Sequence, residues 1–361
     1  MKITSLLFLL SLTFMGLTTA NSAEIKDHTT AIDTLFKKFD RTNGPGASVM
    51  VILDGKKVFT KSYGLADGEG KVCATPDSNY RLASVSKQFT AMAIMILADQ
   101  GKLSFDDPIT KFFPEFPEYG KSITVRHMLN HTSGLIDYED IIPPGTTIPV
   151  LDINVLRLLK QQDKTYFSPG SQFKYSNTGF AFLALIVERV SGQTFASFLS
   201  ENIFKPLRMD HTLAYEQGIS AVSNRAYGYS PEKDGFRRTD QSLTSSVLGD
   251  GGIYSSVNDL YKWDQALYNL KLVSKKTFEA AYTPGKSTEH ENGIRYGFGW
   301  FLSEYRGLKH IYHTGDSIGF RTIISRFPEQ HFTVIVLSNE HDAELPSVAN
   351  KIVDLYLFDN K

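Results

Sequence analysis

The sequence predicts an α/β plus all-α fold, in which an antiparallel sheet built from both chain ends and flanked by helices is interrupted by a mostly helical inserted domain. Segments rich in aromatic and β-branched residues occur near the N-terminus and again in the last third of the chain. Between them, little alternates as a strand would. We therefore expect a signal peptide at 1–23, an α/β domain from 24–105 and 290–361, and a helical domain at 106–289.

The first residues have the layout of a cleaved export signal. Lys2 precedes an apolar run from Leu6 to Leu17, and small residues follow up to Ala23. The apolar run is too short to span a bilayer. We expect a periplasmic or secreted protein with no stable membrane anchor; the alternative is that the segment is retained as an anchor.

The N-terminal part of the α/β domain is expected to supply a helix and a hairpin. Apolar residues recur at helical spacing from Ala31 to Phe39. Two strand-like runs, 47–53 and 57–64, flank Asp54-Gly55, which is a hairpin signal. The segment from Ala91 to Ala98 has no polar face, so we expect a central helix that is buried on every side.

The remaining elements follow from the same patterns. The stretch 103–116 reads as a proline-punctuated loop. Helices are expected at 123–131, 177–190, 195–204 and 257–267, and a closing amphipathic helix at 344–357. Strands are expected at 297–304, 307–313, 321–327 and 332–338.

Composition limits the classes of function. The formal net charge is −1, with 38 basic and 39 acidic residues interspersed, so we expect no nucleic-acid partner. The single cysteine, Cys73, excludes an intrachain disulfide and is interpreted as a packing residue. His290-Glu291 lacks the second histidine of a zinc-peptidase motif, and no phosphate-binding loop occurs. We expect neither a metal nor a cofactor.

Ser84-x-x-Lys87 is the first motif that points to chemistry. If the central helix begins near Ser84, the two side chains lie one turn apart on the same face. Burial and the helix dipole both disfavour the ammonium form of a lysine there, and a neutral amine beside a hydroxyl can act as a base. The alternative is an N-cap serine followed by a surface lysine.

Context distinguishes this motif from two other matches to Ser-x-x-Lys. One begins at Ser171, just after Pro169-Gly170, and the other begins at Ser230, which is followed by Pro231. Neither opens an apolar helix. Ser84 is therefore the candidate nucleophile.

Two further short motifs are individually weak. Tyr175-x-Asn177 lies between a Pro-Gly loop and a helix, but Tyr175 alone is as readily a core tyrosine. His313-Thr314-Gly315 closes a predicted strand, where the glycine would let a substrate approach the backbone. His313 alone could equally be a structural ring.

Taken together and in this order, the three motifs resemble those of the serine β-lactamase and penicillin-binding protein superfamily. The tyrosine in the middle motif resembles the class C β-lactamase branch, with its D-Ala-D-Ala carboxypeptidase, D-aminopeptidase and esterase relatives. Three further segments are similar to recurrent segments of this group: 131–135, 249–255 and 296–300.

The resemblance implies a role for each motif residue. Ser84 would be the acylated nucleophile, and Lys87 and Tyr175 would share the proton transfers. Asn177 would hold the substrate amide or the lysine. The backbone N–H groups of Ser84 and Asp316 would form the oxyanion hole.

One departure bears on the substrate. Class C β-lactamases have Lys-Thr-Gly as the third motif, whereas His313 stands first here and carries no permanent charge. Arg321 could replace the lost cation, but a solvated strand-end arginine is the simpler interpretation.

The resemblance thus implies a secreted serine hydrolase that forms an acyl-enzyme on Ser84. Its favoured substrate is a small molecule or peptide containing a D-amino acid, as in D-Ala-D-Ala carboxypeptidases, and peptidoglycan fragments belong to this class. The alternatives are a β-lactamase or carboxylesterase of the same fold, and a penicillin-binding sensor or scaffold without turnover.

Overall fold

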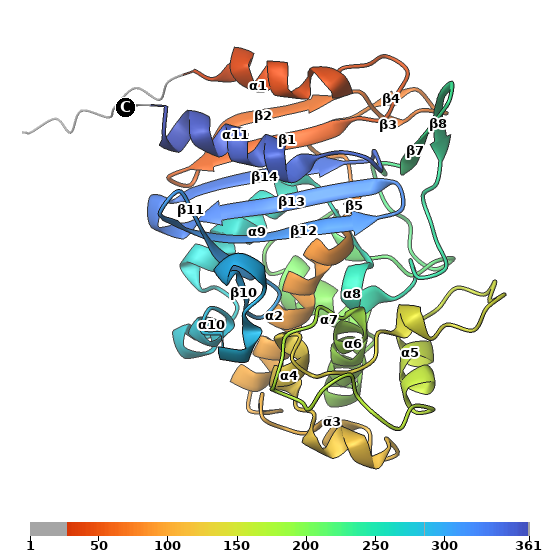
Figure 1. Ribbon diagram of the computed structural model, residues 1–361. Coiled ribbons are helices and arrows are strands. Elements are labelled where there is room, and N and C mark those ends of the chain that lie inside the picture. The colour runs from red at the N-terminus through yellow and green to blue at the C-terminus, as the bar shows by residue number, and fades with distance from the viewer. Residues whose placement is uncertain (1–26, 285, 360–361) are drawn as a thin grey trace, which may run out of the picture.

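The computed structural model describes residues 27–284 and 286–359. Within these residues, a seven-stranded antiparallel sheet has the strand order β10-β11-β12-β13-β14-β1-β2 (Figure 1). The strands are β1 (Ala47–Leu53), β2 (Lys56–Tyr63), β10 (Arg295–Tyr296), β11 (Phe301–Tyr305), β12 (Leu308–Ser317), β13 (Phe320–Phe327) and β14 (Phe332–Ser338). Residues 47 to 53 of β1 pair with residues 338 to 332 of β14. The predicted sheet built from both chain ends is confirmed.

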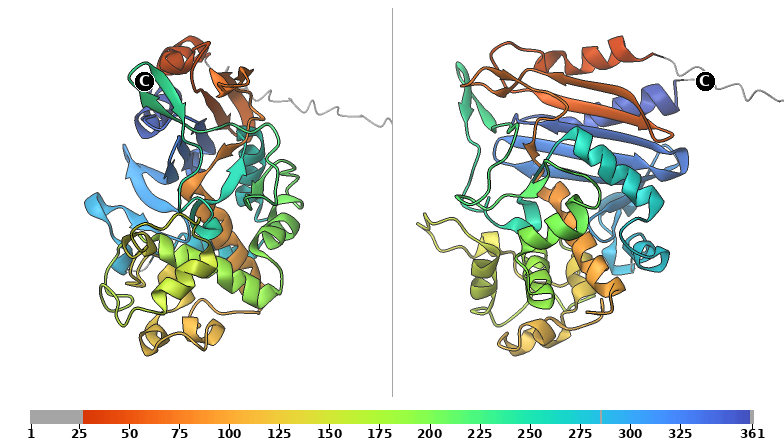
Figure 2. Two further views of the ribbon diagram at one scale, coloured as in Figure 1. Left: turned by 90° about the vertical axis from the view of Figure 1, so that its right-hand side faces the viewer. Right: turned by 180° about the vertical axis from the view of Figure 1, so that it is seen from behind.

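The two faces of this sheet are covered by different helices. The terminal helices α1 (Thr29–Phe36) and α11 (Leu345–Leu357) pack on one face, where Ile32 and Ile352 join an apolar cluster with Val334. Burial of each such side chain stabilises the fold by about 1.5–3 kcal/mol. The opposite face receives α9 (Val257–Asn269), as the view from behind in Figure 2 shows.

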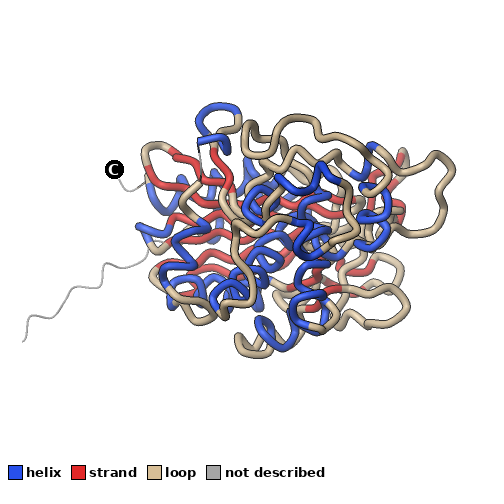
Figure 3. Tube along the Cα trace, turned by 90° about the horizontal axis from the view of Figure 1, so that it is seen from below, coloured by secondary structure: helices blue, strands red, loops and turns tan. Residues whose placement is uncertain are grey.

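Helices and long loops form the other part of the molecule, seen from below in Figure 3. The helices are α2 (Lys87–Asp99), α3 (Ile109–Phe112), α4 (Val125–Leu129), α5 (Asp152–Leu159), α6 (Asn177–Ser191), α7 (Phe195–Leu199), α8 (Leu248–Gly251) and α10 (Lys275–Ala281). Helix α2 packs against α6, and every residue of α2 from Lys87 to Leu97 is buried. The expected buried central helix is confirmed.

The structure also contains short elements that the sequence patterns did not predict. The strands are β3 (Leu65–Asp67), β4 (Val72–Cys73), β5 (Tyr80–Arg81), β6 (Leu213–Ala214), β7 (Tyr229–Glu232), β8 (Gly235–Arg238) and β9 (Ile253–Ser255). Strands of two to four residues are too short to show a period of two. Helix α3 likewise lies in a stretch expected to be a loop.

One sequence expectation, the packing role of Cys73, is wrong, and two others are not tested by the structure. Cys73 is exposed in β4, so its interpretation as a packing residue is wrong. The expected signal peptide, residues 1–23, lies outside the described residues. The domain boundaries at 105 and 290 remain a prediction.

None of the described helices is by itself long and apolar enough to cross a membrane. Helix α6 and the segment Phe195–Phe204 meet that criterion only as a pair bent by 78°. The apolar residues of α6 from Phe180 to Val187 are buried inside the protein.

Candidate active site

Ser84 and Lys87 are joined by a change of helix type. Ser84 lies in a 3₁₀ turn, Ala83–Ser86, and the α-helix begins at Lys87 rather than near Ser84 as expected. A 3₁₀ helix has three residues per turn, so side chains at i and i+3 lie directly above one another. The Lys87 Nζ accordingly donates to the Ser84 Oγ over 3.0 Å.

The turn that carries Ser84 is fixed on both sides by backbone contacts. The N–H of Leu82 donates to the carbonyl of Ile253 in β9 over 2.8 Å. The carbonyl of Leu82 accepts from the Thr322 Oγ1 in β13 over 2.7 Å. The Ser86 Oγ accepts from the N–H of Ile253 over 3.2 Å. Two sheets therefore hold the nucleophile's turn in place.

Gly315 allows strand β12 to lie directly against this turn. A Cβ at position 315 would be 2.1 Å from the Leu82 carbonyl oxygen and 2.2 Å from the Thr322 Oγ1. The residue before the serine, Ala83, has a φ of 49°, a strained conformation for a residue with a side chain. The sequence predicted that this glycine admits a substrate; the structure shows that it admits the chain's own nucleophile turn.

Lys87 is buried and has three acceptors around its nitrogen. Besides the Ser84 Oγ, the Nζ donates to the Asn177 Oδ1 and to the backbone carbonyl of Asp250, each over 2.8 Å. Three acceptors match the three protons of an ammonium group. After loss of one proton, the Ser84 hydroxyl can reverse its bond and donate to the amine. The alternative interpretation of Lys87 as a surface lysine is excluded.

Asn177 is placed by the first turn of α6. Its backbone N–H donates to the Asp137 Oδ2 over 2.8 Å, and its Nδ2 makes a long contact of 3.5 Å with the Glu139 Oε1. Burial and the neighbouring Asp137 raise the pKa of Glu139 above its usual value. An acidic side chain thus lies beside the amide on the side away from Lys87.

Tyr175 lies next to the same lysine. The Lys87 Nζ is 5.0 Å from the centroid of the Tyr175 ring. The Tyr175 hydroxyl is buried and has no hydrogen-bond partner among the described residues. The ring packs against the imidazole of His131, with centroids 4.2 Å apart, and the His131 Nδ1 accepts from the Ser176 N–H. The contacts of the ring hold the phenol in position, while its hydroxyl makes no hydrogen bond with the described residues.

His313 is neutral in this environment. It is 1% exposed, its Nδ1 donates to the Thr314 carbonyl over 2.7 Å, and its Nε2 accepts from the Tyr296 hydroxyl over 2.8 Å. Burial, together with the positive charge of Lys87, lowers the pKa of His313 to about 3. His313 therefore cannot supply the cation that Lys-Thr-Gly enzymes have at this position.

Asp316 and Arg321 form an ion pair across strands β12 and β13. The Arg321 Nη1 lies 2.7 Å from the Asp316 Oδ1, and it also donates to the carbonyls of Ser317 and Phe320. The Arg321 side chain is only 20% exposed, so the expected solvated arginine is wrong. Because Arg321 is already paired, it is not available as a replacement carboxylate anchor.

Two hollows meet at Ser84, and both include Asp316. The larger, about 600 Å³, is lined by Tyr175, His313, Thr314, Phe173 and Phe301, and we call it the Tyr175 hollow. The smaller, about 160 Å³, is lined by Asn177, Glu139, Asp250 and Arg81, and we call it the Asn177 hollow. All the predicted site residues therefore line a hollow beside Ser84 or contact one of its lining residues.

Gly315 to Gly319 also matches Gly-x-Ser-x-Gly, the nucleophile-elbow pattern of α/β-hydrolases. That elbow requires a turn from a strand into a helix. Here the stretch is the tight connection between antiparallel strands β12 and β13, and the Ser317 Oγ is buried without a partner among the described residues. The pattern is not an elbow in this fold.

Asp250 and Asp152 contribute to the site but were not predicted. The Asp250 Oδ2 accepts from the Tyr138 hydroxyl over 2.9 Å, and burial raises the Asp250 pKa to about 7. Asp152 accepts from the N–H groups of Leu248 and Gly249, which fixes the start of α8. Asp250 lies in the segment 249–255, which resembles a recurrent segment of the family, but nothing in that segment indicates what Asp250 does.

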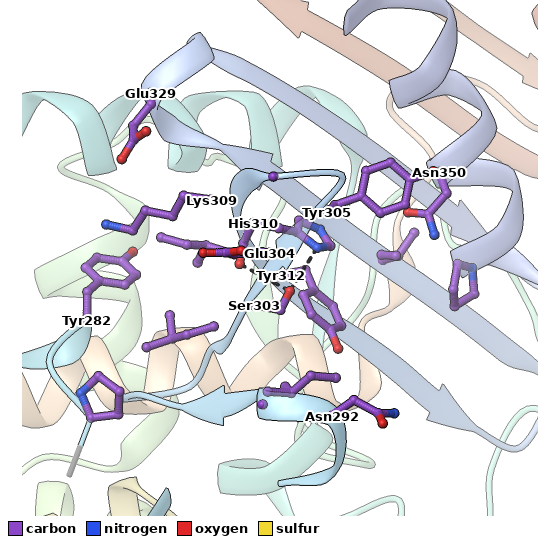
Figure 4. Close-up of a pocket in the computed structure, with 18 residues that line it drawn as sticks. Tyr282, Asn292, Ser303, Glu304, Tyr305, Lys309, His310, Tyr312, Glu329 and Asn350 are labelled. Carbon is purple, nitrogen blue, oxygen red and sulfur yellow. Dashed lines mark hydrogen bonds between the residues drawn. The ribbon is translucent and has the colours of Figure 1, made fainter. Parts of the chain in front are cut away.

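A larger hollow lies elsewhere in the described part of the chain. It measures about 910 Å³ and flanks strands β11 and β12, where Figure 4 shows His310 beside Ser303 and Tyr312. The His310 Nδ1 lies 3.2 Å from the Ser303 Oγ, but burial lowers the His310 pKa to about 4, so it is a weak base. The hollow does not include Ser84, Lys87 or Tyr175. We assign the chemistry to the smaller hollows.

Comparison with known proteins gives a family. The family model described as Beta-lactamase matches residues 32–357. The chain belongs to this family. It is 33% identical to Penicillin-binding protein 4* of Bacillus subtilis (strain 168) over 344 residues, which cover 91% of this chain and 75% of that protein.

Solved structures agree with the family assignment. The octameric penicillin-binding protein homologue from Pyrococcus abyssi superposes with a TM-score of 0.80 at 29% identity, covering 91% of this chain and 77% of that one. The D-amino acid amidase from Ochrobactrum anthropi SV3, solved with D-phenylalanine, gives 0.76 at 25% identity, covering 92% and 98%. The protein is a serine hydrolase with the fold of β-lactamases and penicillin-binding proteins.

Proposed function

We propose that this member of the family forms an acyl-enzyme at Ser84 and cleaves a small amide that contains a D-amino acid, in the manner of a D-Ala-D-Ala carboxypeptidase. The observation that carries the proposal is the position of the Lys87 Nζ, within 3.0 Å of the Ser84 Oγ and 2.8 Å of the Asn177 Oδ1. A buried amine that contacts a hydroxyl in this way is the arrangement of an activated nucleophile.

The proposed reaction runs through two proton transfers. The Ser84 Oγ attacks the carbonyl carbon of the substrate and gives its proton to the amine of Lys87. Backbone N–H groups of Ser84 and Asp316 would stabilise the oxyanion. The leaving amine takes a proton by way of the Tyr175 hydroxyl, which has no competing partner in the described ranges 27–284 and 286–359. Water then hydrolyses the ester at Ser84.

This sequence of steps assigns the two hollows to different parts of the substrate. The proton donor to the leaving group, Tyr175, lines the Tyr175 hollow, so the leaving group occupies that side. The acyl part of the substrate then occupies the Asn177 hollow. The D-amino acid amidase named above, with D-phenylalanine bound, supports a substrate of this class.

The neutral imidazole of His313 supports ranking the turnover of amides whose leaving group has no carboxylate, such as D-amino acid amides, above β-lactam hydrolysis. A β-lactam antibiotic carries a carboxylate that a lysine at this position would hold, and so does the C-terminal D-alanine of a D-Ala-D-Ala peptide. With the pKa of His313 lowered to about 3, that cation is missing at neutral pH. β-Lactamase and carboxylesterase activity are therefore the alternatives within the same site.

Export to the periplasm or the medium, without a membrane anchor, is part of the proposal. It rests on the layout of residues 1–23, and it would place the enzyme where peptidoglycan fragments are available. Mass analysis of the mature N-terminus after expression tests it: an N-terminus near residue 24 is expected, and an intact Met1 in a membrane fraction would contradict it.

The catalytic proposal is tested by intact-mass analysis over time with a D-Ala-D-Ala peptide, a β-lactam and a short-chain ester. We expect turnover of the D-peptide and an adduct of the acyl group that is absent from Ser84→Ala. Persistent β-lactam adducts without turnover of any substrate would favour the sensor alternative. Activity that survives in Ser84→Ala would refute the assignment.

A further inference from the structure

Arg81 is a buried cation next to the nucleophile with most of its hydrogen-bonding capacity unused. It ends strand β5, three residues before Ser84, and is 2% exposed. Its Nη2 donates to the Ser245 carbonyl over 2.7 Å. Its Nε and Nη1 are buried and have no partner among the described residues. A guanidinium offers five N–H donors, so most of them are unpaired here.

Two other largely buried arginines in this chain are each paired with an aspartate. Arg326 is also 2% exposed, and its Nε lies 2.7 Å from the Asp264 Oδ1. Arg225 is paired with Asp240. A buried charge without a counter-ion destabilises a protein by several kcal/mol. Arg81 differs from both because no carboxylate of the described residues is paired with it. Since Arg81 lies beside Ser84, the anion that would pair with it is a group of the bound substrate.

The Asn177 hollow reaches Arg81. It is lined by Arg81 and Asn177 together with the hydroxyl-bearing residues Ser242 and Thr244. Three carboxyl groups also line it. Asp316 is paired with Arg321, and burial raises the pKa of Asp250 to about 7, so that this carboxyl is only partly ionised at neutral pH. Glu139 lies beside Asn177 and is not paired with Arg81.

The other cations near Ser84 are engaged. His313 is uncharged at neutral pH, for the reasons given above. The Lys174 Nζ, at the Tyr175 hollow, lies 3.8 Å from the centroid of the Tyr166 ring. Lys87 already donates to three acceptors. Among the buried cations beside Ser84 in the described part of the chain, Arg81 is thus the one with donors that have no acceptor.

We propose that Arg81 forms an anion subsite in the Asn177 hollow, which binds a carboxylate on the acyl part of the substrate. The inference rests on the proposed function for the direction in which the substrate lies. Its chemistry is a charge-assisted, planar contact between guanidinium and carboxylate, donated by the Nε and Nη1 groups that are otherwise unpaired. The preferred acyl donor would then be acidic, such as a short dicarboxylic acyl group on a D-amino acid.

The test compares two substrates that differ only in this carboxylate, N-succinyl-D-alanine p-nitroanilide and N-butyryl-D-alanine p-nitroanilide. We expect the wild-type kcat/KM to favour the succinyl compound by about 10-fold or more, the size of one hydrogen bond to a charged group. Arg81→Gln should bring this ratio close to one, Arg81→Lys should retain part of it, and Arg157→Gln, at an exposed position, should leave it unchanged. A wild-type ratio near one, or an unchanged ratio in Arg81→Gln, would overturn the proposal.

A second measurement separates this subsite from the proposed function. Succinate should slow the labelling of Ser84 by a fluorophosphonate in the wild type and much less in Arg81→Gln or Arg81→Lys. If neither anilide is turned over, the proposed function fails, yet protection by succinate would still support the subsite. Absence of protection in the wild type would refute the subsite whatever the enzyme hydrolyses.

Discussion

Lys87 and Ser84 face each other across the junction between a 3₁₀ turn and an α-helix, with 3.0 Å between the Nζ and the Oγ. The lysine belongs to the first turn of a helix that is buried along most of its length, while the serine lies in a turn fixed by two sheets. The contact between Lys87 and Ser84 therefore depends on the packing of both the helix and the sheets. Single substitutions can test each side chain that supports it.

Lys87→Met is expected to lower kcat/KM by at least ~10², the usual contribution of a general base. Methionine keeps the volume of the side chain but can neither accept the serine proton nor donate to Asn177. Lys102→Met, at an exposed position just after α2, is the matched control and should behave as the wild type. The measurement is the rate of Ser84 labelling by a fluorophosphonate; labelling of Lys87→Met at the wild-type rate would contradict the assigned role.

Tyr175→Phe should separate catalysis from stability. The Tyr175 hydroxyl has no partner among the described residues, so its removal breaks no hydrogen bond in the free protein. We expect the melting temperature to stay close to that of the wild type while turnover falls by ~10² or more. Tyr282→Phe, which removes another buried hydroxyl without a partner among the described residues but away from Ser84, is the control. A fall in melting temperature that accounts for the lost activity would point to a structural role instead.

Gly315→Ala should displace the nucleophile. The new Cβ would overlap the Leu82 carbonyl oxygen, which lies 2.1 Å from its position, so the turn carrying Ser84 must shift. We expect destabilisation of about 1–3 kcal/mol by overpacking and a loss of Ser84 labelling beyond that explained by unfolding. Gly218→Ala adds backbone strain in open space, since its φ is 80°, and should leave labelling intact. Equal labelling of the two variants would argue against the close packing.

The stability of the protein should fall in acid partly because of His313. Its pKa is about 3 in the folded protein and near 6.5 when unfolded, so between these values the unfolded chain binds more protons. The free energy of unfolding should therefore decrease as the pH is lowered from about 6.5. Urea titrations of His313→Gln should show a weaker decrease than the wild type, and those of the exposed His211→Gln should not. Parallel curves for His313→Gln and the wild type would contradict the burial of a neutral ring.

Asp152 and Asp250 change the stability with pH in the opposite direction to His313. Burial raises both pKa values to about 7, so the folded state binds more protons than the unfolded state between about pH 4 and 7. Their contribution to stability is lost as the pH rises through 7. This contribution is the same in the wild type and in His313→Gln, so the difference between their stability curves reports the contribution of His313 alone.

The long elements and the motif residues could be predicted because their signals are local. Helix α2 was recognisable from a run of apolar helix formers, and strand β1 from its β-branched residues beside a turn. The helix and the strand depend on residues close together in the sequence. Ser84, Lys87, Tyr175 and Asn177 were recognisable because short motifs, each weak alone, occur together and in a fixed order along the chain.

The missing parts are those that only three-dimensional packing decides. Asp250 contributes a backbone carbonyl to Lys87, and any residue type has one, so side-chain identity gives no signal. The charge of His313 follows from burial beside Lys87 and Tyr296, and the pairing of Arg321 follows from strand register. The unpaired donors of Arg81 are visible only when its surroundings are known.

The position of β1 between β2 and β14 constrains how the polypeptide can be made. Until residue 338 has been synthesised, one entire edge of β1 has no partner, although β1 itself is among the first segments to emerge. The sheet therefore cannot close on the ribosome while the last strand is still missing. A chain of this topology therefore keeps an unpaired edge of β1 until β14 has been made, and an unpaired strand edge can pair wrongly with another chain in the meantime.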